Sequence, residues 1–147
     1  MIYTARFEDV KTIIKMALNI PQEHGFENLP KVNLEKVCEY FYSKFEEAPI
    51  FVYKNPEGNI IGFVGAEITE MWWSTDPVVT DYVFYVDPEY RSPEVFETLI
   101  GALKDFAKLN KMPIISYFLA GKRLKAKEKL YEKNGFKNSG FITTYGM

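Results

Sequence analysis

The segment that decides the fold is VFYVDPEYRSPEVFETLIGALKDFAK, residues 83–108. It opens with β-branched and aromatic residues, which predict a strand ending at Val86. Ser92 then caps a predicted helix over Pro93–Leu109, because serine is a favoured N-cap and proline suits the first helical position. Backbone N–H groups at such a helix start point to one place, with the positive end of the helix dipole behind them. The turn is therefore suited to a phosphate or another anion.

Length and charge narrow the class of protein. The chain has 147 residues, 47% of them apolar and 26% charged, which suits one domain over residues 1–147 and is too short for two typical ones. Its formal charge of -2 argues against a general binder of nucleic acid or anionic membranes, since both rely on a basic excess. No apolar run reaches signal-peptide or membrane-span length, so we expect a soluble, cytoplasmic protein that does not bind membranes.

Metal and triad chemistry find little support in the residue content. Cys38 is the only cysteine and His24 the only histidine, which leaves no zinc-ligand set and no Ser/His or Cys/His pair at a recognisable spacing. Cys38 falls on the apolar stripe of a predicted helix, and we interpret it as a buried structural residue. The sequence thus predicts a site without a metal.

Strand and helix patterns alternate along the chain. The predicted strands are Ile2–Arg6, Ile50–Lys54, Ile60–Trp72, Val78–Val86, Ile114–Leu119 and Phe136–Tyr145. The predicted helices are Val10–Leu18 with Asp9 as its cap, a helix that Asn33 caps and that ends near Glu47, Pro93–Leu109 and a last one ending near Lys133. Residues 19–32, between the first two helices, are expected to form a loop. The helical crossover predicts that Val78–Val86 and Ile114–Leu119 run parallel and diverge at their C-terminal ends. The expected fold is mixed α/β (α+β), in the order βαα-βββ-α-β-α-β, with a central sheet of about six strands and helices on both faces.

Two motifs in this order resemble the GNAT superfamily of acyl-CoA-dependent N-acyltransferases. The first looks like the family's acyl-CoA binding turn, in which a hydrophobic strand is followed by V-x-P-x-Y-R, here Val86–Arg91, and then by a long helix. The septet LYEKNGF over residues 130–136 is similar to its L-Y-E-K-x-G-F motif near the C-terminus. Glu94 and Phe96 depart from the pattern, because the family usually has small residues there, and Leu124 stands where it usually has an Asn that contacts pantetheine.

The resemblance implies acetyl-CoA as cosubstrate and a role for each motif. Arg91 and the N–H groups from Ser92 to Phe96 would bind the pyrophosphate, while the backbone of Phe84–Val86 would meet the pantetheine amides and the thioester carbonyl. The implied cofactor-binding residues are Phe84, Tyr85, Val86, Arg91, Ser92, Glu94, Val95 and Phe96. The hydroxyl of Tyr131 would protonate or hydrogen-bond the leaving thiolate. A packing role for Tyr131 and a plain surface role for Arg91 remain open.

The acceptor would be a primary amine of a small molecule or a protein. Its base could be Glu67, Glu70 or Asp81, of which we carry Glu67 and Asp81 as catalytic candidates. Strand alternation alone does not tell which of them faces the cleft, and deprotonation through water is a further alternative. Of the pair Trp72-Trp73, we expect one indole in the core and the other in a substrate pocket or an oligomer interface such as that of a homodimer.

Two other functions stay open beside the N-acetyltransferase. One is a GNAT-fold binding or structural protein that has lost CoA, which the departures at Glu94, Phe96 and Leu124 support. The other is a nucleic-acid module that uses the basic residues between 122 and 129. It is less favoured, because at helical spacing those charges spread around the helix.

Overall fold

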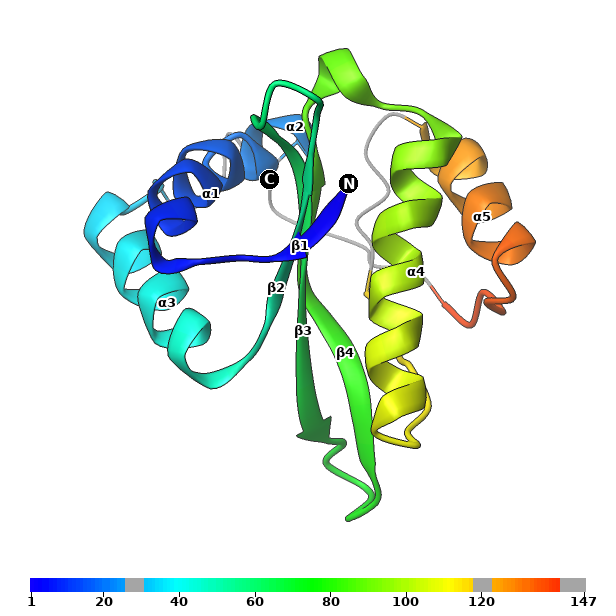
Figure 1. Ribbon diagram of the computed structural model, residues 1–147. Coiled ribbons are helices and arrows are strands. Elements are labelled where there is room, and N and C mark those ends of the chain that lie inside the picture. The colour runs from blue at the N-terminus through cyan, green and yellow to red at the C-terminus, as the bar shows by residue number, and fades with distance from the viewer. Residues whose placement is uncertain (26–30, 118–122, 141–147) are drawn as a thin grey trace.

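The computed structural model describes residues 1–25, 31–117 and 123–140. Its sheet has the order β1-β2-β3-β4, with every neighbouring pair antiparallel. The strands are β1 (Ile2–Thr4), β2 (Ile50–Lys54), β3 (Ile60–Glu70) and β4 (Pro77–Val86). Figure 1 shows helices on both faces, as predicted. One face carries α1 (Val10–Ala17), α2 (Ile20–Glu23) and α3 (Leu34–Glu47), and the other carries α4 (Pro93–Leu109) and α5 (Leu124–Lys133).

The predicted caps at Asn33 and Ser92 are confirmed, whereas the side chain of Asp9 makes no capping hydrogen bond to α1. The side chain of Asn33 accepts a hydrogen bond from the Lys36 N–H at 3.0 Å, and Ser92 Oγ accepts one from the Val95 N–H at 3.3 Å. The face of α4 that packs on the sheet is apolar and buried: Val95, Leu99, Ile100, Leu103 and Ala107. Truncating a buried leucine such as Leu103 typically costs about 2–5 kcal/mol, so this packing fixes the turn between β4 and α4.

The predicted count of about six strands is not confirmed. In place of the strand Ile114–Leu119, the described residues form one parallel bridge, between Val79 and Ile114. The predicted parallel direction is confirmed at that bridge, and residues 118–119 lie outside the described part. Residues 136–140 form no strand, since Lys, Asn, Ser and Gly there have low β-propensity, and residues 141–145 of the last predicted strand lie outside the described part.

The structure corrects the predicted end of β3, the predicted burial of a tryptophan and the loop predicted before α3. The strand expected to reach Trp72 ends at Glu70, so strand alternation does not extend to the tryptophans. Trp72 and Trp73 are 92% and 61% exposed and pack on each other with ring centroids 5.4 Å apart, so neither is in the core. The segment expected to be a loop after residue 18 contains the short helix α2.

A β-bulge in β4 sets the direction of the side chains that follow. Gly65 pairs with Val83 and Ala66 pairs with Asp81, which leaves Tyr82 as an extra residue. Tyr82 and Val83 are consecutive, yet both pack on the apolar cluster under α1 and α3. Within the described ranges no helix is both long and apolar enough to cross a bilayer.

Candidate active site

Three polar side chains meet on the α4 side of β4. Ser116 Oγ and Tyr131 Oη share a hydrogen bond at 3.4 Å, and the Asp81 carboxylate accepts the Tyr117 N–H at 3.1 Å. Asp81 and Tyr131 are each only 6% exposed. Buried polar groups are costly unless they are hydrogen-bonded, and these groups bond to one another and to the backbone.

The environment of this cluster shifts its acid–base properties. Burial raises the pKa of Asp81 to about 6, against the opposing effect of hydrogen bonds from Ser116 and the Tyr117 N–H. Burial also raises the pKa of Tyr131, and the charge of Asp81 raises it further. At neutral pH Asp81 is therefore a carboxylate able to take a proton, and Tyr131 is a protonated phenol able to give one.

Aromatic rings hold Tyr131 in place. Its ring meets Phe96 at a centroid distance of 5.1 Å and Phe136 at 5.3 Å, both edge to face. Phe96 in turn lies 5.4 Å from Phe84 of β4. Edge-to-face pairs of this kind are favourable and restrict ring motion. The hydroxyl of Tyr131 is thus fixed beside Ser116.

The turn between β4 and α4 is held by contacts within the protein. Arg91 Nε donates to the Val86 carbonyl at 2.9 Å, and its guanidinium forms an ion pair with Glu23 of α2. The Val95 N–H bonds to the Ser92 hydroxyl, as described above. The phosphate role of Arg91 and of this turn remains a prediction, and an anion bound here would compete with Glu23 for the guanidinium.

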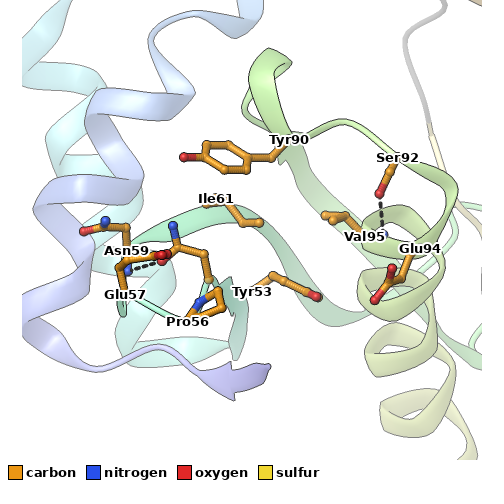
Figure 2. A pocket seen from close by; sticks show the side chains of 10 residues that line it. Tyr53, Pro56, Glu57, Asn59, Ile61, Tyr90, Ser92, Glu94 and Val95 are labelled. Atoms are coloured by element: carbon orange, nitrogen blue, oxygen red, sulfur yellow. Dashed lines mark hydrogen bonds between the residues drawn. The ribbon is translucent and has the colours of Figure 1, made fainter.

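An open pocket of about 540 Å³ lies between the β2–β3 turn and the start of α4 (Figure 2). Its lining residues are Tyr53, Asn55, Pro56, Glu57, Asn59, Ile61, Tyr90, Ser92, Glu94 and Val95. Glu94 lies on the wall of this pocket, whereas Phe96 lies against Tyr131. Residues two apart point about 200° apart on a helix, so the Glu94 carboxylate is directed away from the polar cluster.

The three β4 residues predicted to meet acyl-CoA alternate between the two faces. Phe84 and Val86 pack toward α4, and Tyr85 packs toward α1, where its hydroxyl donates to Glu23 at 3.2 Å. The backbone of all three pairs with β3 along one edge. A cosubstrate would therefore meet them from the other edge of β4.

The carboxylates proposed as bases do not come together. Glu67 faces α3, where it forms an ion pair with Lys44, while Asp81 faces α4 and Tyr131. Glu70 is exposed at the end of β3. Sequence reasoning missed Ser116, although a hydroxyl within an apolar segment was a usable signal. It also missed Glu23 and Lys44, for which the sequence carries no comparable signal.

Comparison with known families identifies the fold. Residues 46–138 match the model of the acetyltransferase (GNAT) domain. The chain belongs to the GNAT acetyltransferase family. No protein of curated function matches the sequence significantly.

Solved structures resemble this GNAT protein over its whole length. A probable acetyltransferase has a TM-score of 0.77 at 17% identity, covering 100% of this chain and 96% of its own. A predicted acetyltransferase from Clostridium acetobutylicum, solved with acetyl-CoA, has 0.77 at 15% identity, with 99% and 95% covered. The aminoglycoside antibiotic 6'-N-acetyltransferase from Acinetobacter haemolyticus has 0.73 at 16%, with 100% and 97% covered. At these identities the likeness shows the fold alone.

Proposed function

We propose that this GNAT chain is a single N-acetyltransferase domain over residues 1–147 that moves an acetyl group from acetyl-CoA to a primary amine. The observation that carries the proposal is the polar cluster of Asp81, Ser116 and Tyr131. It joins a carboxylate of raised pKa to a buried phenol through one hydroxyl, which supplies a base and an acid within one site.

The chemistry follows from these residues. Asp81 takes a proton from the acceptor ammonium, directly or through water, and the neutral nitrogen attacks the thioester carbonyl in a ternary complex. Backbone N–H groups of β4 stabilise the oxyanion. The new C–N bond forms as the C–S bond breaks, and Tyr131 gives its proton to the leaving thiolate. The nitrogen releases its second proton to water, and Ser116 returns the proton from Asp81 to Tyr131, so one ammonium and one thioester give an amide, a thiol and one proton in solution.

The residues at the turn fit acetyl-CoA in part. Ser92 is the N-cap of α4, the first residues of that helix are exposed, and Arg91 precedes them. An anion site requires such an exposed helix N-terminus. Glu94 lines the open pocket together with Ser92 and Val95, where solvent would screen its repulsion of a pyrophosphate. Residues Arg91 to Val95 would hold the pyrophosphate, and the free edge of β4 would hold the pantetheine arm.

A GNAT-fold binding protein without acetyl-CoA is the second candidate, and one observation favours it. Phe96, at a position where the family usually has a small residue, fills the space beside Tyr131 with its ring. If that ring blocks the pantetheine arm, the fold remains and the transfer activity is lost.

Thiol release from acetyl-CoA, measured with a thiol-reactive dye and a panel of primary amines, tests the proposal. We expect amine-dependent release that falls about 10- to 100-fold in Ser116→Ala, because the variant breaks the path between base and acid. Lys11→Ala, at an exposed residue of α1 on the other face of the sheet, is the control and should retain full rate. Absence of amine-dependent release across the panel would favour the binding protein.

A further inference from the structure

A second polar group lies on the opposite side of β4, under α3. The Lys44 ammonium pairs with the Glu67 carboxylate and lies 5.3 Å from the centroid of the Tyr82 ring and 5.8 Å from that of Tyr40. The two rings pack edge to face, with centroids 6.3 Å apart. Both ring distances are within the range of cation–π attraction. The ammonium of Lys44 thus sits among two aromatic faces and one carboxylate, an arrangement that we call the ammonium cage.

The cage differs from the other lysine–carboxylate pairs of the described chain. In the Arg91–Glu23 pair the cation also lies near a ring, 5.7 Å from the centroid of Tyr85, but it is a guanidinium. Lys54–Asp9 and Lys133–Glu97 are also lysine–carboxylate pairs, yet among the described residues only Lys44 places its ammonium over aromatic rings. The pKa of Lys44 is raised, chiefly by its hydrogen bond to Glu67. The surroundings therefore favour the charged form of a primary amine.

The position of Tyr82 in the cage is set by the packing of its ring and not by a hydrogen bond of its hydroxyl. Gly65 lies directly beneath that ring, and any side chain there would overlap the ring atoms. The Tyr82 hydroxyl is buried and makes no hydrogen bond within the part of the chain that the structure describes. A buried hydroxyl without a partner is unfavourable, so its own bonding does not account for the position of this side chain.

We propose that Tyr40, Tyr82 and Glu67 form the acceptor site of the proposed transferase, and that Lys44 is an internal stand-in for the acceptor, a primary alkylammonium on an unbranched aliphatic arm. The assignment of this cage as the acceptor site rests on the proposed function. Tyr82 follows Asp81 in the bulge and their side chains face opposite layers, so an amine in the cage would pass its proton to Asp81 only through water around the free edge of β4. An amine held over Tyr82 is one residue along β4 from the polar cluster.

The cage also defines the acceptor class. Lys44 reaches it through a four-carbon stem, so a linear amine of similar reach fits once that side chain swings out into solvent. The carboxylate of Glu67 needs an N–H donor, which a quaternary ammonium lacks. The cage is therefore selective for primary amines over trimethylated ones.

Binding of n-butylamine in the absence of acetyl-CoA tests the proposal, with the tyrosine-ring resonances of the full chain followed by NMR. Lys44→Met removes the internal ligand and should tighten n-butylamine binding by about 10-fold or more. If Lys44 fills the site about nine-tenths of the time, the apparent affinity of the parent is about 10-fold weaker than that of the vacant site. The matched control is Lys54→Met, which vacates the carboxylate of Asp9 in a pair without aromatic faces and should bind no better than the parent. Butyltrimethylammonium should bind Lys44→Met at least about 3-fold more weakly than n-butylamine.

Second substitutions in the Lys44→Met background locate the binding. Tyr40→Leu should weaken n-butylamine binding about 2- to 5-fold through loss of one ring face, and Glu67→Gln should weaken it about 5-fold or more. If Lys44→Met melts well below the parent, Lys44→Gln takes its place, with the same prediction.

In this titration the inference would be overturned by no gain of n-butylamine binding in a folded Lys44 variant, or by an equal gain in Lys54→Met. Because acetyl-CoA is absent from this titration, its result is independent of the transfer activity. A chain that binds n-butylamine in the cage and never acetylates an amine would contradict only the proposed function. A chain that acetylates amines with a KM unaffected by Lys44→Met and Tyr40→Leu would contradict only the acceptor site.

Discussion

The carboxylate of Asp81 takes the hydrogen bond that a continued parallel ladder would give to the backbone carbonyl of the same residue. The Val79 N–H bonds to the Pro113 carbonyl and the Ile115 N–H bonds to the Val79 carbonyl, both at 2.9 Å. The next bond in this pattern would run from the Tyr117 N–H to the Asp81 carbonyl, but it goes to the side chain at 3.1 Å. Regular backbone pairing of β4 with the segment after α4 therefore stops at Asp81, the residue whose pKa is raised by burial.

Replacing this carboxylate should stabilise the protein at neutral pH. The pKa of Asp81 is about 6 when folded and 3.8 as the ordinary value. Between these values the folded state binds more protons, so the free energy of unfolding falls as pH rises through that window. Above pH 6 burial of the charge costs about 3 kcal/mol in order of magnitude.

Asp81→Asn keeps an oxygen acceptor for Tyr117 and carries no charge. Denaturant unfolding should show the variant more stable than the parent at pH 7.5, by up to about 3 kcal/mol, with the difference shrinking toward pH 4. It should also lose transfer activity. Equal stability at both pH values would mean that the carboxylate is not buried as an anion.

Tyr131→Phe separates acid catalysis from packing. Phenylalanine keeps the contacts with Phe96 and Phe136 and removes only the hydroxyl. We expect kcat to fall about 10- to 1000-fold with little change in acetyl-CoA affinity. Steady-state kinetics of thiol release measure both quantities. Phe136→Leu, which alters the packing and keeps the hydroxyl, should affect melting temperature more than kcat. Equal turnover of Tyr131→Phe and the parent would assign Tyr131 to packing.

Two glycines give opposite predictions for the same substitution. Gly65→Ala places a methyl group against the Tyr82 ring and should destabilise the fold by about 1–3 kcal/mol, because overpacking displaces the ring or the strand. Gly101→Ala lies within α4 with open space around the new methyl and should stabilise by about 0.5–1 kcal/mol through helix propensity. Thermal or denaturant unfolding of the two variants checks the signs. A neutral Gly65→Ala would show that Tyr82 moves freely.

The ion pair between Glu23 and Arg91 should weaken acetyl-CoA binding. Glu23→Gln removes the competing carboxylate and should tighten binding about 2- to 5-fold, while Arg91→Ala should weaken it by a similar factor. Glu89→Gln removes an equal charge from the same turn without touching the pair and serves as the control. If Glu89→Gln and Glu23→Gln tighten binding equally, net charge and not the pair is responsible.

The sequence predicted elements whose signals are local. The caps Asn33 and Ser92 and the bounds of α4 were predictable, because a cap and an apolar helical spacing each depend only on residues close in sequence. The face of Asp81 was not predictable, since the bulge at Tyr82 shifts strand alternation and depends on the register with β3. The pairings of Glu23 with Arg91 and of Lys44 with Glu67 join distant segments, so no local pattern indicated them.

Calorimetric titration of the intact chain with acetyl-CoA tests the central claim most directly. The claim is that the turn after β4 and the free edge of β4 still accept the cosubstrate although Glu94 and Phe96 replace small residues. We predict saturable binding at one site with a Kd below about 1 mM, corresponding to about -4 kcal/mol or more favourable. A folded chain that shows no saturable heat at several times that concentration would contradict the account.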